Sequence, residues 1–159
     1  MRTLRKSLYS LLAAVGIMLT MGGFTTASAN TSENPETAAV SCSGHITYSR
    51  THPSGLGELV IYYNSSNGGT NSACFYHRGA AYGVPANTSV QIVRCTQTSG
   101  EGQACTADQT SRRDTGNFSF YAGPVGVTGT AARCVAAAGY IDWNGVRYSM
   151  SSGRQGCPN

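Results

Sequence analysis

The side chains that could do chemistry are few in this sequence, and they do not form a known catalytic pattern. Nucleophilic catalysis needs a serine or cysteine beside a base, yet no serine lies in a Gly-x-Ser-x-Gly motif. The candidate bases are His45, His52 and His77. His45 and His77 fall in expected strands, where packing or hydrogen bonding is the usual role, and His52 precedes a proline in an expected loop. No catalytic residue is therefore predicted.

A pair of carboxylates is the other catalytic arrangement to consider, because glycosidases place two of them across the scissile bond. Glu58 and Asp142 are the acidic residues that fall within expected strands. Most of the others lie in turns or polar segments, where a solvated charge is the ordinary role. Glycosidase chemistry would require the fold to bring Glu58 close to Asp142.

Stacking of a ligand on aromatic rings is the more plausible chemistry. Aromatic side chains that are exposed together on strands form flat platforms for sugar rings, although packing in the core explains each of them alone at least as well. A planar row facing solvent would indicate a carbohydrate-binding module. The candidate ligand-binding residues are Tyr62, Tyr76, Tyr121, Trp143 and Tyr148.

Cysteines are the remaining reactive side chains, and their even number indicates disulfides in an oxidising compartment. The six are Cys42, Cys74, Cys95, Cys105, Cys134 and Cys157. Zinc is the alternative, but there is no Cys-x-x-Cys motif and the histidines are not placed to complete a site. We therefore predict no metal and no cofactor.

Hairpin geometry predicts how the cysteines pair. Residues opposite each other in a hairpin have numbers with a constant sum, and the Asn144-Gly145 turn places Trp143 opposite Val146. The sum for Cys134 and Cys157 differs from that sum by two, and Cys95 and Cys105 flank a turn-rich segment. The predicted bridges are Cys95–Cys105, Cys134–Cys157 and, by elimination, Cys42–Cys74.

The amino-terminal segment has the features of a secretory signal. Met1–Ala29 combines a positively charged start, a mostly apolar run over Leu8–Gly22 and small residues at Ala27-Ser28-Ala29. A transmembrane anchor is the alternative, but the apolar run is short for one. Residues 30–41 are polar and unpatterned, which predicts a flexible leader, and a single domain is expected over residues 42–159.

The charge of the exported part excludes two classes of partner. Of the 11 basic residues 3 precede residue 30, which leaves 8 against 7 acidic residues, a net charge near +1. Binding to nucleic acid or to an anionic membrane needs a clustered basic surface. Neither partner is predicted once the signal is removed, and no feature of the sequence specifies an oligomeric state.

The elements that must position these residues are strands. Gly57–His77 predicts a hairpin around Ser-Asn-Gly-Gly, and both faces of its first strand are apolar, as in a central strand covered on two sides. Further strands are expected at His45–Ser49, Thr88–Gln97 and Asn117–Ala122. A second hairpin is expected around Asn144-Gly145. Pro124 should mark a bend or an edge position.

Two other segments are predicted to lack regular structure. Ala107–Thr115 is polar and should form a solvated loop, and Ala131–Ala138 should be irregular. Seven or eight short strands with glycine, proline and asparagine between them predict an all-β fold, a small antiparallel β-sandwich or barrel with three disulfides.

Three tracts of the sequence are distinctive: Leu59–Asn64 with the following Asn67-Gly68 and Cys74, then Phe120–Val125, and Arg133–Val135. These tracts resemble the spore-associated protein A family of small secreted proteins from spore-forming filamentous bacteria. Cys95 and Cys105 form an added pair, and the Trp-Gly-Gly of the family is missing after Cys134, so the loops should differ. The resemblance implies an extracellular or spore-surface location and supplies no catalytic residue.

The function expected from the sequence is that of a secreted, non-enzymatic β domain associated with the cell or spore surface. Its partner would be a polymer of the cell wall or spore coat. One alternative is a carbohydrate-binding module that uses exposed aromatics. Another is an extracellular hydrolase or an inhibitor, and an inhibitor should present a protruding loop braced by a disulfide, for which Thr96–Ala104 is the candidate.

Overall fold

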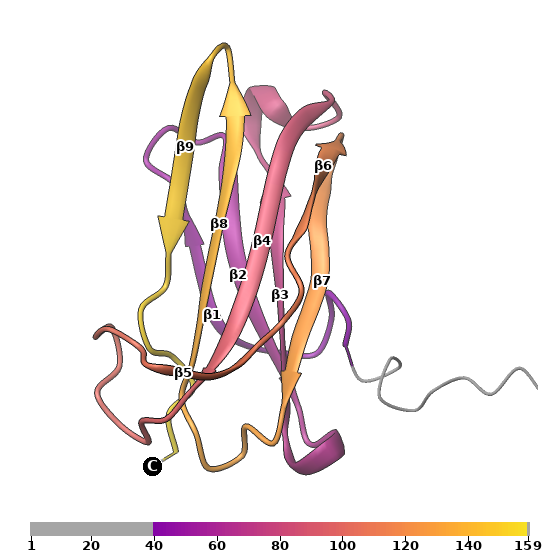
Figure 1. Ribbon diagram of the computed structural model, residues 1–159. Coiled ribbons are helices and arrows are strands. Elements are labelled where there is room, and N and C mark those ends of the chain that lie inside the picture. Colours follow the sequence, from indigo (N-terminus) through magenta and orange to yellow (C-terminus); the bar gives the residue numbers. More distant parts are fainter. Residues whose placement is uncertain (1–39, 159) are drawn as a thin grey trace, which may run out of the picture. The chain divides into compact units, whose positions relative to one another are not determined.

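A computed structural model describes residues 40–158, which form an all-β domain of nine strands (Figure 1). The predicted signal, Met1–Ala29, and most of the predicted leader lie outside the described residues. The strands are β1 (His45–Thr51), β2 (Gly57–Asn64), β3 (Thr70–His77), β4 (Ala86–Cys95), β5 (Ala107–Thr110), β6 (Asp114–Phe118), β7 (Tyr121–Thr128), β8 (Val135–Trp143) and β9 (Val146–Ser151). Two short 3₁₀ turns, η1 (Ser66–Gly68) and η2 (Gly79–Ala81), follow β2 and β3.

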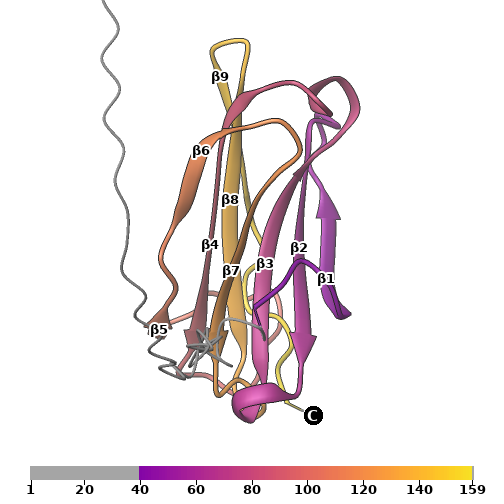
Figure 2. The same ribbon diagram turned by 90° about the vertical axis from the view of Figure 1, so that its right-hand side faces the viewer.

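The strands form two antiparallel sheets that pack face to face, which confirms the predicted sandwich. The first sheet has the order β1-β2-β3-β7. The second has the order β5-β4-β8-β9, and β6 also pairs with β4. Figure 2 shows the two layers, with β1, β2 and β3 in one and β4, β8 and β9 in the other. The apolar side chains of the two inner faces form the core.

The hairpin of β2 and β3 lies at the centre of the first sheet, as predicted. Its register runs from Gly57 opposite His77 to Asn64 opposite Thr70. The turn contains Asn67 with φ 54°, a conformation that asparagine tolerates better than most residues. Leu59 of β2 is fully buried in the core, and Val60 on the opposite face is 3% exposed, which confirms that the strand is covered on two sides.

The segment Val40–Gly44 provides that second cover, and we call it the strap. Cys42 is bridged to Cys74 of β3, and the Ser41 amide donates a hydrogen bond to Ser72 Oγ at 3.2 Å. Figure 2 shows the strap crossing β3 and β2 before the chain enters β1. The predicted leader extended to residue 41, but its last two residues lie against the sheet, so the folded part begins by residue 40.

Phe75 of β3 is the largest fully buried side chain, and two glycines make room for it. A Cβ atom at Gly139 of β8 would lie 2.6 Å from the Phe75 ring and 2.7 Å from the Ser89 carbonyl oxygen. Gly57 of β2 touches the same ring from the first sheet. Because Gly57 and Gly139 have no side chains, the Phe75 ring fits between them and the two sheets can pack closely at this point.

All three predicted disulfides are formed. The Cα–Cα distances are 5.9 Å for Cys42–Cys74, 5.4 Å for Cys95–Cys105 and 4.1 Å for Cys134–Cys157. The predicted hairpin that carries the last of them is also present, with Trp143 opposite Val146.

Three predictions of local structure were wrong, and in each case pairing between distant strands decides the conformation. Ala131–Ala138 was expected to be irregular, but β8 begins at Val135 because it pairs with β4. The expected loop Ala107–Thr115 contains β5 and the start of β6, which also pair with β4. Asn117–Ala122 was expected to be one strand, but the chain crosses there from the second sheet to the first, between β6 and β7.

Strand β7 is an edge of the first sheet, as the prediction for Pro124 required. The Gly123–Pro124 peptide is cis, and Pro124 has no N–H to offer. Side chains from the second sheet accept hydrogen bonds from two backbone amides of β7. The Gly123 amide donates to Asp114 Oδ2 at 2.6 Å, and the Thr128 amide donates to Gln109 Oε1 at 3.2 Å.

Candidate functional site

The five aromatic residues predicted as a platform do not form one row. Tyr62, Tyr76 and Tyr121 lie together on the outer face of the first sheet. Trp143 and Tyr148 belong to β8 and β9 of the second sheet, where both side chains are partly buried and pack against the core.

Tyr76 is the centre of the three neighbouring tyrosines. It pairs with Tyr121 across β3 and β7, with ring centroids 5.5 Å apart and ring planes inclined by 46°. The Tyr76 hydroxyl donates to the carbonyl oxygen of Cys42 at 3.3 Å and lies 2.8 Å from the hydroxyl of Tyr62. Burial, followed by the bond to Tyr62, raises the pKa of Tyr76, so this phenol stays neutral.

Two further aromatic side chains extend this surface toward the end of the sandwich. Tyr82 follows η2 and is 62% exposed, Phe120 lies in the turn between β6 and β7 and is 50% exposed, and Tyr121 is 43% exposed. The Tyr82 and Phe120 rings meet edge to face with centroids 5.2 Å apart. Tyr76, Arg78, Tyr82, Phe120 and Tyr121 line an open depression of about 490 Å³, which we call the aromatic shelf.

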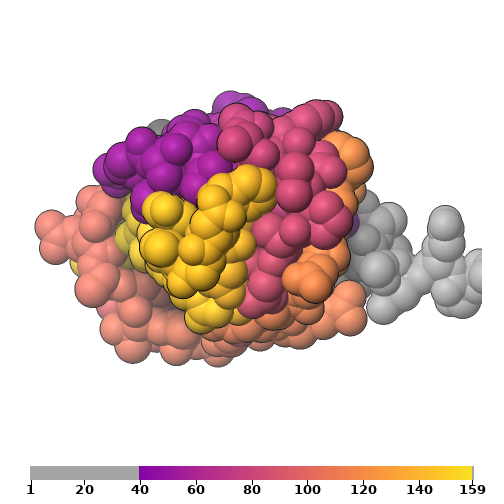
Figure 3. Space-filling model, turned by 90° about the horizontal axis from the view of Figure 1, so that it is seen from above, coloured from indigo at the N-terminus to yellow at the C-terminus, as the bar shows by residue number. Residues whose placement is uncertain are grey.

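Backbone hydrogen bonds hold the two loops of the shelf together. The Gly83 amide donates to the Ser119 carbonyl, and the His77 amide donates to the Phe120 carbonyl, both at 2.8 Å. Gly83 has φ 80°, which lets the chain turn back at this point. Figure 3 looks onto this end of the domain and shows the pink segment after β3 next to the orange turn between β6 and β7. The exposed rings are therefore held by an ordered backbone.

The charged groups of the shelf neutralise each other. Arg78 Nη2 lies 2.6 Å from Glu58 Oε2, another of its nitrogens donates to the His77 carbonyl, and its guanidinium lies 4.8 Å from the Tyr76 ring centroid. Burial raises the pKa of Glu58, but hydrogen bonds from Ser49 and Arg78 outweigh it, and the pKa of this carboxyl is lowered. Glu58 is therefore ionised and paired with Arg78.

His77 supports the shelf from inside the core. Its ring is fully buried, with Nδ1 3.1 Å from the Ala81 carbonyl oxygen and Nε2 2.6 Å from Thr88 Oγ1. Burial lowers the pKa of His77, so the imidazole is neutral, and its Nδ1 donates to the Ala81 carbonyl oxygen. The ring thereby fixes η2 and the loop that carries Tyr82.

The other histidines also have structural surroundings. His45 is exposed at the start of β1. His52 Nδ1 lies 2.9 Å from Ser54 Oγ, and its ring meets Tyr148 edge to face at 5.5 Å. Within residues 40–158, no histidine has a carboxylate among its hydrogen-bond partners. A Ser-His-Asp arrangement is therefore not assembled in this part of the chain.

The two carboxylates proposed as a possible glycosidase pair lie in different sheets. Glu58 is bound to Arg78 in the first sheet. In the second, Asp142 accepts from Arg147 Nε at 2.7 Å and from Asn87 at 2.8 Å, and the bond from Arg147 chiefly lowers the pKa of Asp142. Each carboxylate is thus committed to its own arginine. The described residues also contain no cluster of three His, Cys, Asp or Glu side chains that could hold a metal.

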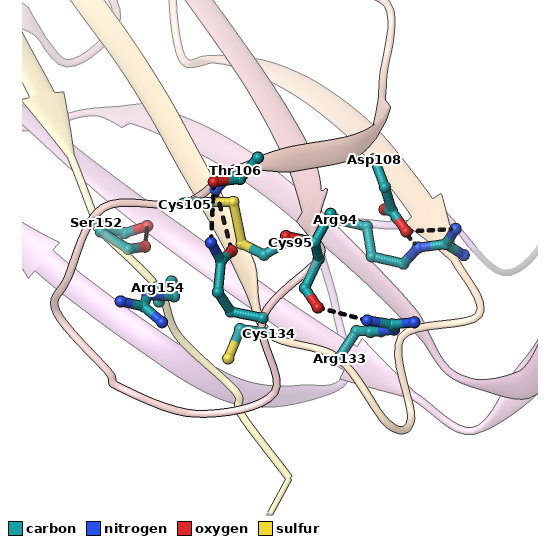
Figure 4. The surroundings of a disulfide bond; sticks show 12 residues. Arg94, Cys95, Cys105, Thr106, Asp108, Arg133, Cys134, Ser152 and Arg154 are labelled. Atoms are coloured by element: carbon teal, nitrogen blue, oxygen red, sulfur yellow. Dashed lines mark hydrogen bonds and ion pairs between the residues drawn. A yellow bond between two sulfur atoms is a disulfide. The ribbon is translucent and has the colours of Figure 1, made fainter.

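The loop Thr96–Ala104 protrudes and is braced at its base by Cys95–Cys105 (Figures 1 and 4). The carboxy-terminal segment holds it from one side, since the Gly102 amide donates to the Arg154 carbonyl at 2.7 Å and the Arg154 amide to the Gln103 carbonyl at 2.8 Å. Gly100 and Gly102 have φ values of 82° and 77°. The tip is therefore a turn and not an extended strand.

Tyr82 and Phe120 are the residues that sequence reasoning missed. Tyr82 lies in the connection between β3 and β4, and Phe120 was assigned to a strand that the structure divides. The turn-forming glycine after Tyr82 and the Gly123-Pro124 pair after Phe120-Tyr121 were the available signals that these rings lie at the end of the sandwich.

Comparison with known proteins adds no relative to this description: the chain matches no family model, no curated protein and no solved structure. Among residues 40–158 there is also no helix with the length and apolar character needed to cross a membrane.

Proposed function

We propose that this protein is a secreted, non-enzymatic β domain that attaches to a polymer of the cell or spore surface through the aromatic shelf. The observation that carries the proposal is the exposure of Tyr82, Phe120 and Tyr121 side by side on an ordered backbone. A group of exposed aromatic side chains marks a binding surface, because burial would otherwise be the favourable state of each ring.

Two features support secretion. Met1–Ala29 has the sequence pattern of an export signal, and all six cysteines are paired, as is typical of proteins in oxidising compartments. The resemblance to the spore-associated protein A family points to the same location.

The catalytic and inhibitory alternatives have less support. His77 is buried against Ala81 and Thr88, and Glu58 and Asp142 are each paired with an arginine. The braced loop Thr96–Ala104 has the protrusion expected of an inhibitor, but its tip turns at Gly100 and Gly102, whereas a protease cleft takes an extended peptide.

Sedimentation with insoluble polymers tests the proposal. The mature protein should co-sediment with isolated cell walls, chitin or spore coats, and Phe120→Ala should weaken this binding. Val146→Ala is the matched control, because Val146 is 51% exposed at the β8–β9 turn, outside the shelf. Equal binding by both variants, or no binding to any of the polymers, would contradict the proposal.

Fractionation of a culture tests the location. The protein should be found with cell walls or spores and should be released from them by the Phe120→Ala substitution. Recovery of the wild-type protein solely inside cells would exclude a surface role.

A further inference from the structure

We propose that the aromatic shelf binds a single chain of an uncharged polysaccharide by stacking, without any contribution from charge. This inference rests on the proposed function and names the class of polymer that the shelf takes.

The orientation of the rings determines which form of polymer fits. The Tyr82 and Phe120 ring planes are inclined by 68°, and those of Tyr76 and Tyr121 by 46°. The sequence predicted a flat platform, but rings inclined in this way form a corrugated surface. Such a surface follows the contour of one flexible sugar chain, whereas the flat face of a crystalline polymer would touch few of the ring atoms.

The free ring surface belongs to the three most exposed residues. The guanidinium of Arg78 lies over Tyr76, and the same ring packs against Tyr121. The Tyr76 ring therefore supports its neighbours and offers little free surface of its own. Tyr82, Phe120 and Tyr121 remain exposed to solvent and present apolar ring surface to the C–H faces of sugar rings.

The hydroxyl groups at the shelf suit a ligand rich in hydroxyls. The Tyr82 and Tyr121 hydroxyls make no hydrogen bond within the described residues, whereas those of Tyr62 and Tyr76 are bonded to each other. An exposed phenol both donates and accepts, so it can bond to a neutral sugar hydroxyl in either direction.

The charges at the shelf disfavour an anionic polymer. Arg78 is the lining cation, and it is bound to Glu58, to the His77 carbonyl and to the Tyr76 ring. A phosphate or carboxylate would have to displace Glu58 and would then face its unpaired charge. The residues after position 29 carry 8 basic and 7 acidic side chains, so little long-range attraction for a polyanion exists.

Binding to soluble probes at two salt concentrations tests this assignment. The probes are uncharged oligosaccharides of glucose, N-acetylglucosamine, mannose and galactose, together with a polyglycerol phosphate teichoic acid. At least one uncharged oligosaccharide should bind, and its affinity should change by less than about twofold between about 50 mM and about 500 mM sodium chloride. Phe120→Ala and Tyr121→Ala should each weaken binding by about tenfold, and Val146→Ala should not.

Cell walls with and without their anionic polymers separate failure of this inference from failure of the proposed function. Binding should survive removal of those polymers, and soluble uncharged oligosaccharide should compete. Binding that Phe120→Ala weakens, but that depends on the anionic polymers and falls with salt, would overturn the inference and leave attachment through the shelf in place. No binding to any wall preparation or oligosaccharide would remove both.

Self-association is the competing use of an exposed aromatic surface. Sedimentation velocity of the wild type and of Phe120→Ala over a range of concentrations detects it. A monomer at all concentrations agrees with the inference. A dimer that Phe120→Ala dissociates would assign the shelf to a second copy of the chain and overturn it.

Discussion

His77 shows how a residue that could have been a catalytic base instead stabilises the loop that carries Tyr82. The ring is buried and neutral, and its two nitrogens connect η2 to β4 through Ala81 and Thr88. An exposed imidazole at a strand end would be free to titrate and to serve as a base. Burial removes that possibility and turns the ring into a fixed support for the loop that carries Tyr82.

Acid should therefore destabilise the domain through His77. Burial lowers its pKa in the folded state, so the unfolded chain binds a proton more readily. The stabilisation is complete above the unfolded value of about 6.5 and is lost as the pH falls through the lower folded value. The melting temperature of the wild type should fall between about pH 7.5 and about pH 5, and His77→Gln should show a smaller fall. Parallel curves for the two proteins would contradict this role.

Gly139 offers a second test at the scale of one residue. Gly139→Ala places a methyl group against the Phe75 ring and the Ser89 carbonyl oxygen. Because the carbonyl belongs to the backbone of β4, it cannot move aside as a flexible side chain could. The free energy of unfolding in urea should fall by about 1–3 kcal/mol. Ala138→Ser is the control, because Ala138 is the exposed neighbour in the same strand. A Gly139→Ala protein as stable as the wild type would show that the two sheets can separate at this point.

At the scale of elements, the strap is the segment whose contribution can be isolated. The Cys42–Cys74 bridge joins residues 32 apart in sequence, and Cys95–Cys105 joins residues 10 apart. Because a longer loop loses more unfolded-state entropy, the paired Cys→Ser replacements should cost about 4 kcal/mol for the first bridge and about 3 kcal/mol for the second. Urea unfolding of both double variants measures the difference. A larger loss for the shorter loop would show that the strap contributes little.

The elements also show what the sequence can and cannot predict. Asn67-Gly68 and Asn144-Gly145 are local signals, and both hairpins follow from them. The register of the second hairpin and the disulfide at its open end also follow from Asn144-Gly145. Strands β5, β6 and the start of β8 have weak local signals, because what makes them strands is pairing with β4. Local patterns describe hairpins well and long-range pairing poorly.

The same distinction applies to the candidate site. Tyr76 and Tyr121 were among the predicted aromatics, but their exposure depends on which face the strap covers. Trp143 and Tyr148 are also aromatic residues on strands, but their side chains pack against the core. Tyr82 and Phe120 join the shelf because a backbone bond between Gly83 and Ser119 unites two loops far apart in sequence.

At the scale of the whole molecule, oxidation is expected to decide whether the domain folds. The three bridges close loops of sequence separation 32, 10 and 23, which together stabilise the fold by about 10 kcal/mol in the chain-entropy model. That sum is comparable to the whole stability of an ordinary domain. The reduced protein should therefore lack a cooperative thermal transition in circular dichroism, and reoxidation should restore it. An unchanged transition in strong reductant would contradict this estimate.

The edge strand β7 has a consequence for contacts between copies of the chain at high concentration. Its proline offers no donor, and the amides of Gly123 and Thr128 already bond to Asp114 and Gln109. A neighbouring copy thus finds no open row of peptide groups at this edge along which to extend the sheet. Copies at high concentration can therefore remain separate at this edge instead of joining into amyloid-like aggregates.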